Sequence, residues 1–459
     1  METDMASFSA GLGGKGTFSR GVHPPDQKLF SADAPIEVLP APETVVLPLS
    51  QHIGAPCKAA VKTKQEVQIG DVVGQAGGFV SAPIHAPLSG KAKKLVNVTL
   101  PTGRRVPALP ITAENGEATA ESRKLYDELV SDDWDTAGIT KLDRQAIIDA
   151  ISEAGIVGLG GAAFPAHVKL TPNKEKPVDV LLINGCECEP YLTADYRIML
   201  EASRSLVAGT LIAARAAGAD KTVIAIEDNK PQAVEAVRRA AQGTGIEVTA
   251  LKTKYPQGSE KHLIVAVTGR KVPPGALPLD VGVVVSNVGT ACAMAFAVLK
   301  KKPLTHRVIC VTGAGIRQPK NLFVPIGTPY RALIDYCGGL TTDAVRVISG
   351  GPMMGFAFTD LDLPVTKGTS GVTVLIRDDV KKAAETACVR CGRCVDACPM
   401  NLVPTKLAMA ARNQAPDVAE AYHIMACIEC GCCAYTCPAS LPLVQLIRLG
   451  KIQAAAKKQ

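Results

Sequence analysis

Two short runs of cysteines near the end of the chain repeat one spacing, Cys-x2-Cys-x2-Cys-x3-Cys-Pro. The first run consists of Cys388, Cys391, Cys394 and Cys398, and the second of Cys427, Cys430, Cys433 and Cys437. In this spacing three thiolates surround one four-iron cubane, and the fourth cysteine ligates the cluster of the other run. We therefore predict two 4Fe-4S clusters, one held by Cys388, Cys391, Cys394 and Cys437, the other by Cys427, Cys430, Cys433 and Cys398.

Zinc is the alternative metal, because Cys-x2-Cys pairs also bind it tetrahedrally. A zinc site does not need eight cysteines in two matched runs with trailing prolines, so the pattern favours iron and sulfide. Gly392 and Gly431 allow backbone amides to approach the sulfur atoms. Cys432 is surplus to the spacing, and we interpret it as a buried bystander.

A second candidate site is the glycine-rich stretch at residues 155–165, which contains Gly158, Gly160 and Gly161. Glycines let backbone N–H groups reach a phosphate, but glycine clusters also form many ordinary loops. The stretch departs from the dinucleotide fingerprint, because no strand precedes it and no acidic residue follows at the expected offset. By itself it predicts a loop and does not identify a ligand.

The composition limits the class of protein. A chain of 459 residues has room for about three domains, and 47% hydrophobic with 20% charged residues exclude disorder as the main state. One Trp, 8 Tyr and 9 Phe argue against a base-stacking surface, so no nucleic-acid partner is expected. The net charge of +7 carries no sustained basic run.

The 15 cysteines come without an apolar export signal at the N-terminus, which indicates reduced thiols in a cytosolic protein. The longest apolar stretch, residues 281–299, contains Ser286, Asn287, Gly289 and Thr290, so it fits a buried strand, turn and helix better than a membrane span. The seven histidines show no metal-ligand spacing. Most of the six scattered cysteines are expected to be small buried residues, with Cys186 and Cys188 as possible exceptions.

The elements that must position these sites follow from periodicity. Residues 35–112 predict short strands with tight turns, and residues 81–90 look like a hairpin of a lipoyl- or biotinyl-type barrel-sandwich that lacks the carrier lysine. Strands at 177–183, 222–226 and 245–249 alternate with helices, one of them at 231–242, which predicts a mostly parallel sheet. A short α+β pattern covers 307–346, and short helices follow residue 379.

Four segments resemble the NADH-oxidising flavoprotein subunit of respiratory complex I. They are the glycine-rich loop at 158–169, the Asn-x-x-Glu-x-Glu-Pro segment at 184–197, and residues 255–260 and 287–290. With residues 20–28, the barrel-sandwich, the α+β segment and the paired cysteine runs, nearly the whole chain is similar to the RnfC family. These are the NADH-binding peripheral subunits of Rnf electron-transport complexes.

The resemblance implies a multidomain α/β plus α+β fold. An N-terminal region with an all-β barrel-sandwich hybrid is expected at 1–130, a Rossmann-like FMN and NADH domain at 131–303, a small ubiquitin-like (SLBB) α+β domain at 304–376, and a helical domain of two-cluster ferredoxin type at 377–459.

The resemblance also assigns ligand contacts by position. It places FMN near Gly158, Gly160, Gly161, Lys169, Asn184, Glu187, Tyr255, Gly258, Asn287 and Thr290. It places NADH near Phe164, against the nicotinamide or adenine, and near Glu189 and Glu260, at ribose hydroxyls. Without it, Glu187 and Glu189 would be interpreted as surface carboxylates, and Tyr255 and Phe164 as core residues. Leu159, Cys186 and Ser259 depart from the complex I pattern, where Arg, Asp and Glu are usual.

The implied function is NADH oxidation on FMN, followed by transfer of single electrons through two 4Fe-4S clusters to membrane-embedded and peripheral partner subunits and to ferredoxin, coupled to movement of Na+ or H+. No catalytic acid or base is needed, and the expected place is the cytoplasmic face of the cell membrane. Two alternatives stay open: the NADH-oxidising subunit of a soluble hydrogenase or formate dehydrogenase, and a flavin-free iron–sulfur relay or assembly scaffold.

Overall fold

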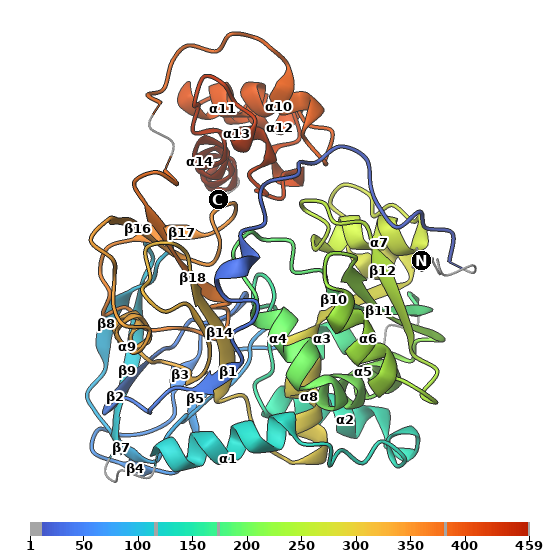
Figure 1. The fold of residues 1–459 in the computed structure, drawn as a ribbon, viewed down its shortest axis with the longest axis vertical. Coiled ribbons are helices and arrows are strands. Elements are labelled where there is room, and N and C mark those ends of the chain that lie inside the picture. The colour runs from blue at the N-terminus through green and yellow to red at the C-terminus, as the bar shows by residue number, and fades with distance from the viewer. Residues whose placement is uncertain (1–11, 114–117, 172–174, 381–382, 458–459) are drawn as a thin grey trace.

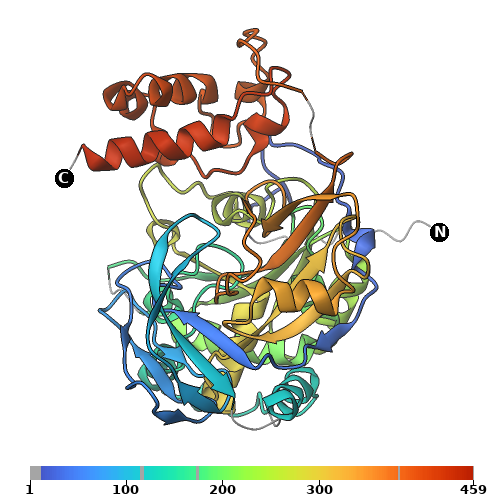
Figure 2. The ribbon, with the colours of Figure 1, turned by 90° about the vertical axis from the view of Figure 1, so that its left-hand side faces the viewer.

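The computed structural model describes residues 12–113, 118–171, 175–380 and 383–457. A helical, cysteine-rich unit lies at one end of a larger body, in which β-rich units pack beside an α/β unit (Figures 1 and 2). None of the described helices combines the length and the apolar character needed to cross a membrane. The predicted fold class, an all-β unit, an α/β unit, an α+β unit and a helical unit, is confirmed.

The N-terminal all-β unit consists of two small antiparallel sheets, in the orders β2-β9-β7-β4, with β8 beside β9, and β3-β5-β6. The strands are β2 (Thr44–Pro48), β3 (Lys58–Ala59), β4 (Glu66–Val67), β5 (Val72–Gln75), β6 (Ile84–His85), β7 (Gly90–Ala92), β8 (Val96–Thr99) and β9 (Arg105–Ala113).

The expected hairpin at residues 81–90 is wrong, because its two strands do not pair with each other. Strand β6 pairs with β5, and β7 pairs with β4 and β9, so this segment crosses from one sheet to the other. Residues 81–88 are all buried. A hairpin exposes one face, whereas this segment lies between two sheets.

The α/β unit contains four parallel strands in the order β12-β11-β10-β13. They are β10 (Val180–Gly185), β11 (Lys221–Glu227), β12 (Glu247–Leu251) and β13 (Val283–Asn287). Helix α7 packs its Leu263 and Ile264 on one face of the sheet, and α5 and α8 pack on the other. The helices are α2 (Arg144–Glu153), α3 (Ala166–Leu170), α4 (Ala194–Glu201), α5 (Ser203–Ala217), α6 (Pro231–Ala240), α7 (Glu260–Thr268) and α8 (Val288–Leu299).

The strand order of this sheet reverses at β10. The chain moves from β10 outward through β11 to β12, and then returns to place β13 on the opposite side of β10. In parallel α/β sheets, ligands bind outside the carboxyl ends of the strands at such a reversal. The carboxyl ends of β10 and β13 therefore mark the expected position of a ligand crevice.

The α+β unit is a six-stranded sheet in the order β1-β15-β14-β18-β16-β17, with α9 (Tyr330–Tyr336) packed against it. Its strands are β1 (Ile36–Val38), β14 (His306–Thr312), β15 (Lys320–Pro325), β16 (Ala344–Ser349), β17 (Phe356–Phe358) and β18 (Gly371–Ile376). Strand β1 comes from the N-terminal region, so this sheet combines segments that are far apart in the sequence. The domain boundaries after residues 130, 303 and 376 stay predictions.

The all-β and α/β units share one hydrophobic core. A single cluster of buried side chains includes Val45 and Ile84 of the all-β unit, hereafter also the sandwich, together with Ile183 and Leu206 of the α/β unit. Helix α1 (Ala118–Val130) follows the all-β unit and precedes the α/β unit in the sequence, and its Leu129 belongs to the same cluster.

The cysteine-rich unit contains five α-helices among the described residues: α10 (Arg393–Asp396), α11 (Pro404–Arg412), α12 (Pro416–Ala421), α13 (Cys432–Tyr435) and α14 (Leu443–Ala456). Helix α10 begins directly after Gly392, and α13 directly after Gly431, the equivalent residue of the second run. Both glycines have a positive φ, 77° and 83°. The sequence repeat is therefore also a repeat of backbone structure.

Candidate redox site

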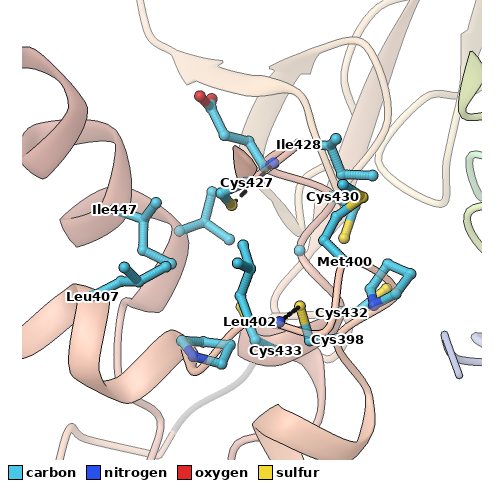
Figure 3. Close-up of a pocket in the computed structure, with 15 residues that line it drawn as sticks. Cys398, Met400, Leu402, Leu407, Cys427, Ile428, Cys430, Cys432, Cys433 and Ile447 are labelled. Carbon is cyan, nitrogen blue, oxygen red and sulfur yellow. Dashed lines mark hydrogen bonds between the residues drawn. The ribbon is translucent and has the colours of Figure 1, made fainter. Parts of the chain in front are cut away.

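A cavity, hereafter the cysteine cavity, lies between the second cysteine run, the end of the first run and the helices α11 and α14 (Figure 3). Its empty volume is about 360 Å³, part of it open to solvent. Four of the thiols that line it are those of Cys398, Cys427, Cys430 and Cys433, the set that the spacing assigns to one cluster. Most of the other lining side chains are apolar, among them Leu402, Leu407, Ile428, Val444 and Ile447.

Backbone N–H groups point at two of these sulfurs. The amide of Leu402 donates to Cys398 Sγ at 3.4 Å, and the amide of Glu429 donates to Cys427 Sγ at 3.3 Å. Such bonds stabilise thiolates and tune cluster potentials. Burial raises the pKa of the Cys427 thiol to about 11, and a bound metal would lower it, because metal binding requires the thiolate form.

The four thiols surround a space and do not meet at one point. Among the described side chains, no three of His, Cys, Asp or Glu converge tightly enough for a single metal ion. A cubane needs ligands spread around a cage, whereas Zn2+ needs four donors on one centre. Two matched sets of four thiols are the donor set of two four-iron clusters and exceed what one zinc ion needs.

The first cysteine set is more open. Cys394 and Cys437 lie in one apolar cluster with Cys433, whereas Cys388 and Cys391 are exposed on the loop before α10. The amide of Arg390 donates to Cys388 Sγ at 3.4 Å, the counterpart of the Glu429 bond in the second run.

Backbone conformation is repeated between the runs at non-glycine positions as well. Left-handed φ angles occur at Arg390 (56°) and Glu429 (57°), and at Asn401 (57°) and Ser440 (52°). These conformations are uncommon outside glycine. Their recurrence at equivalent positions indicates that both runs fold into the same ligand loop.

The second candidate site is the region outside the carboxyl ends of β10 and β13, at the reversal of the parallel sheet, hereafter the crevice. Asn184 and Asn287 lie at the ends of β10 and β13 and are paired in register there. Asn184 Nδ2 donates to the carbonyl of Gly258 at 2.7 Å, and Asn287 Nδ2 donates to Asp195 Oδ2 at 2.6 Å. Asn287 Oδ1 also accepts the first amides of α8, so the two asparagines fix the loops around the crevice.

The glycine-rich loop lies directly over this crevice. The amide of Gly158 donates to the carbonyl of Phe164 at 2.9 Å, which closes the loop, and the amide of Leu159 donates to Thr290 Oγ1 at 2.8 Å. A Cβ at Gly160 would lie 2.5 Å from Asn287 Nδ2, so only glycine fits there. A Cβ at Gly161 would have no heavy atom within 4 Å, so this part of the loop faces open space.

Two buried basic side chains of the α+β unit bind backbone carbonyls of the glycine-rich loop. Lys367 Nζ donates to the carbonyls of Gly155 at 2.7 Å and Pro83 at 2.6 Å, and Arg307 donates to the carbonyls of Leu159 at 3.1 Å and of Lys367. Burial lowers the pKa of Lys367 to about 7 and that of Arg307 to about 10. No sequence pattern indicates either role, because a cation that binds carbonyls has no characteristic spacing.

Lys169 and Glu260 lie at the mouth of the crevice and pair with each other. Lys169 Nζ is 2.5 Å from Glu260 Oε1 and 3.3 Å from the carbonyl of Val285. Both side chains are 37% exposed, so they remain accessible to a ligand. A phosphate at this place would compete with Glu260 for the ammonium.

Glu187 and Glu189 are not free surface carboxylates. Glu187 caps α4, because its two oxygens accept the amides of Asp195 and Tyr196 at 3.0 and 3.2 Å. Glu189 Oε1 accepts the amides of Met353 and Met354 at 2.7 and 3.1 Å. Their structural roles position the loops of the crevice, and a direct ligand contact by either stays a prediction.

Asp195 is a crevice residue that the assignment by position left out. It is half-buried beside Glu187 and Asn287, and desolvation, with the charge of Glu187, raises its pKa to about 7. The only sequence signal was its place in the Asn-x-x-Glu-x-Glu-Pro segment at 184–197.

Tyr255 joins the loops of the crevice to the loop of Cys430, which lines the cysteine cavity, and this junction is called the shared wall below. Tyr255 is buried, and its hydroxyl donates to the carbonyl of Cys430 at 2.7 Å and lies 3.3 Å from Glu189 Oε2. The amide of Gly258 donates to Cys188 Sγ at 3.2 Å, and Cys188 packs in one apolar cluster with Tyr255 and Cys430. A sheet reversal of the kind that binds nucleotides is thus joined through one tyrosine to a cavity lined by four cysteine thiols, which is the arrangement expected of a flavin and iron–sulfur electron-transfer subunit.

Comparison with known proteins agrees with this class. Four family models match in chain order: the RnfC barrel-sandwich hybrid domain at 16–116, the Nuo51 FMN-binding domain at 151–295, the SLBB domain at 308–357 and the 4Fe-4S dicluster domain at 387–441.

Two relatives are similar over almost their full length. One, from the proton-translocating ferredoxin:NAD+ oxidoreductase complex of Clostridium ljungdahlii, is 46% identical, over 96% of this chain and 94% of the relative. The other, from the Na+-translocating ferredoxin:NAD+ oxidoreductase complex of Acetobacterium woodii, is 43% identical, over 97% and 98%. The chain belongs to the RnfC family, whose members are subunits of ion-translocating ferredoxin:NAD+ oxidoreductase complexes.

Among solved structures, a chain of an NAD+-reducing NiFe-hydrogenase in its H2-reduced state is similar with a TM-score of 0.49 and 23% identity. The match covers 70% of this chain and 63% of that chain.

Proposed function

We propose that this chain is the NADH-oxidising peripheral subunit of an Rnf-type complex. It takes electrons from NADH at the crevice and passes them through two 4Fe-4S clusters to partner subunits and, through them, to ferredoxin, coupled to translocation of Na+ or H+. The observation that carries the proposal is the shared wall, where Tyr255 links the crevice to the backbone of Cys430.

FMN is the cofactor that fits the crevice. When bound, it accepts a hydride and releases electrons singly. The open side of Gly161, beside Gly158 and Gly160, offers backbone N–H groups for the phosphate, and Lys169 offers a positive charge. The remaining residues proposed to hold FMN are Asn184, Glu187, Tyr255, Gly258, Asn287 and Thr290.

NADH is proposed to enter at the mouth of the crevice. Phe164 is half-buried and supplies an apolar surface for a ring of the dinucleotide. Glu260 is exposed enough to accept hydrogen bonds from ribose hydroxyls. Glu189 would need to release the Met353 and Met354 amides before it could do so. Because the cofactors exchange the hydride directly, the chain needs no acid or base of its own.

The two cluster sites are proposed to act in series. The set of Cys398, Cys427, Cys430 and Cys433 lies against the crevice through Tyr255, and the set of Cys388, Cys391, Cys394 and Cys437 includes the exposed thiols. Electrons would therefore reach the buried cluster first and leave from the exposed one. We place the subunit on the cytoplasmic face of the membrane, held by its partner subunits.

The test uses the full chain reconstituted with iron, sulfide and FMN under anaerobic conditions. We expect NADH to bleach the flavin band and then the broader cluster band. Brown protein without flavin and without a response to NADH would contradict the proposal and support the relay alternative. Identification of the subunits that copurify from membranes would test the placement.

A matched glycine pair tests the FMN site. Gly161→Ala places a methyl group in the open side of the loop and should weaken FMN binding about tenfold, equivalent to about 1.4 kcal/mol, without loss of folding. Gly138→Ala, whose Cβ would lie 3.7 Å from Asp135 Oδ2, is the control and should bind FMN normally. Equal FMN affinity in both variants would place the phosphate elsewhere.

A further inference from the structure

The N-terminal segment at residues 12–31 crosses three units of the fold. Figure 1 shows it, in blue, passing between the cysteine-rich unit and the body. Its first part runs along the α/β unit: the amide of Gly16 donates to the carbonyl of Ala266 at 2.9 Å, and the amide of Lys252 donates to the carbonyl of Gly16 at 3.0 Å.

The middle of the segment binds the first cysteine run just before Cys398. Arg20 Nη1 donates to the carbonyl of Val395 at 2.8 Å, and the amide of Gly21 donates to the carbonyl of Ala397 at 3.2 Å. The next residue, Val22, exchanges two backbone hydrogen bonds with Tyr255, at 2.9 and 3.0 Å. Three consecutive residues thus join a cysteine loop to the tyrosine of the shared wall.

The end of the segment is fixed to the other side of the crevice. Lys28 is buried, and its Nζ donates to the carbonyls of Glu189 at 3.0 Å and Leu192 at 2.6 Å. The carbonyl of Asp26 accepts the amide of Tyr191 at 2.7 Å. The segment therefore holds the Glu-x-Glu-Pro loop as well as the cysteine loop.

A further contact to a backbone carbonyl lies on the other side of Cys398. His262 Nε2 lies 3.2 Å from the carbonyl of Pro399, and the Phe18 ring packs against the His262 ring with centroids 4.6 Å apart. The contacts to Val395, Ala397, Pro399 and Cys430 all end on backbone carbonyls, so they fix the loops that carry Cys398 and Cys430 without using a thiol.

We propose that residues 20–28 are a positioning strap that sets the separation between the crevice and the cysteine cavity, and with it the rate of electron passage between them. The inference rests on the proposed function. It gives a role to a sequence segment that neither the ligand contacts nor the thiol ligands explain, and Arg20, Gly21 and Lys28 are positioning residues in it.

Gly21 provides the sharpest variant. Its φ is +83°, and a Cβ would lie 2.5 Å from the carbonyl oxygen of Tyr255 and 3.1 Å from the Phe18 ring. Gly13, in the same segment, has a φ of +82°, but its Cβ would lie 3.5 Å from the nearest atom, the carbonyl oxygen of Thr268. Gly21→Ala and Gly13→Ala therefore introduce similar backbone strain, and only Gly21→Ala displaces the strap from Tyr255.

The experiment uses the full chain loaded with FMN and clusters, with NADH as donor in a stopped-flow spectrometer. We expect Gly21→Ala to bleach flavin at the wild-type rate and to reduce the clusters several-fold more slowly, because the rate of electron transfer falls as the distance between donor and acceptor grows. Gly13→Ala should match wild type in both phases. Hydrogen exchange of the cofactor-free chain should show faster exchange at residues 393–399 in Gly21→Ala only.

The inference is overturned if Gly21→Ala slows cluster reduction no more than Gly13→Ala, or if exchange at 393–399 is unchanged. If Gly21→Ala does not fold, Arg20→Met tests the inference instead and should slow cluster reduction several-fold. Its control is Lys15→Met, which replaces an exposed cation of the same segment and should leave cluster reduction unchanged. Equal rates in these two variants would also overturn the inference. Failure of wild type to accept electrons from NADH would instead contradict the proposed function.

Discussion

The two cysteine runs share their spacing and their backbone conformation, yet their surroundings differ. In the second run Cys430 and Cys433 are buried and face an apolar cavity, whereas Cys388 and Cys391 of the first run are exposed. Gly392 has no neighbour within 4 Å of its Cβ position, and Gly431 has the carbonyl oxygen of Met353 at 2.7 Å. One loop motif is thus used in two environments, and the surrounding units set the burial of each.

This difference has a functional meaning. Cluster potentials depend on solvent exposure and on hydrogen bonds to the sulfurs. The buried set lies against Tyr255 and the crevice, and the exposed set is accessible to another protein. Burial can therefore separate an internal acceptor from an external donor even though both sites have the same ligands.

The largest expected effect comes from removing one ligand of each set. Cys430→Ser and Cys391→Ser should each lower the iron content from about eight to about four per chain. NADH should still reduce the remaining cluster in Cys391→Ser, but not in Cys430→Ser, because the buried cluster receives electrons first. Iron analysis and electron paramagnetic resonance after NADH addition measure this. The opposite pattern would reverse the order of the two clusters.

Oxidative loss of the clusters should also distinguish the two sets. Exposed thiolates are more accessible to oxidants and chelators than buried ones. During titration with ferricyanide and a chelator, the cluster on Cys388, Cys391, Cys394 and Cys437 should disappear several-fold faster than the other. Loss of both at one rate would show that exposure in the isolated chain does not control access.

The equivalent glycines give a smaller effect on stability. Gly392→Ala should lower the free energy of unfolding by only about 1 kcal/mol, because alanine is strained in a left-handed backbone conformation. Gly431→Ala should lower the free energy of unfolding by the same amount and by about 1–3 kcal/mol more, because its methyl group overpacks against Met353. In thermal unfolding of the cluster-loaded variants, the midpoint temperature of Gly431→Ala should therefore be several degrees below that of Gly392→Ala. Equal midpoint temperatures would mean that the loop of Met353 moves away from the added methyl group without loss of stability.

The smallest effect is expected from the ion pairs beside the runs. Arg412 pairs with Glu385 near the first run, with side chains 39% and 40% exposed, and Arg412→Met should cost at most about 0.5 kcal/mol of unfolding free energy. Arg448 pairs with Glu429, donates to the carbonyl of Met354 and lies 4.3 Å from the centre of the Phe356 ring. Arg448→Met should cost about 1 kcal/mol or more, and denaturant unfolding compares the two variants.

Local patterns predicted much of the scaffold. The strand expected at 222–226 is β11, the helix expected at 231–242 begins at Pro231 as α6, and the α+β pattern expected at 307–346 contains β14, β15 and α9. Each element buries an apolar face within its own span, so its periodicity is visible in one stretch of sequence. The cysteine spacing likewise grouped Cys398 with the second run, and the structure brings these residues to one cavity.

Contacts between distant residues left no such signal. The bond from Tyr255 to Cys430 spans 175 residues, and the bond from Lys367 to Gly155 spans 212. The expected hairpin at 81–90 failed for the same reason, because the partners of β6 and β7 lie outside that segment. Resemblance pointed to Tyr255 and Glu189 as ligand residues, and the structure adds that both hold neighbouring units in place.

The hydrophobic cluster that joins Val45 and Ile84 to Ile183 and Leu206 has a consequence for folding. Side chains that share one interior lose their contacts together, so the sandwich at 44–113 and the parallel sheet should melt in one cooperative transition. A fragment that starts at residue 131 would expose that interior to water and should aggregate. The sandwich is in this respect half of a folding unit, not a detachable module.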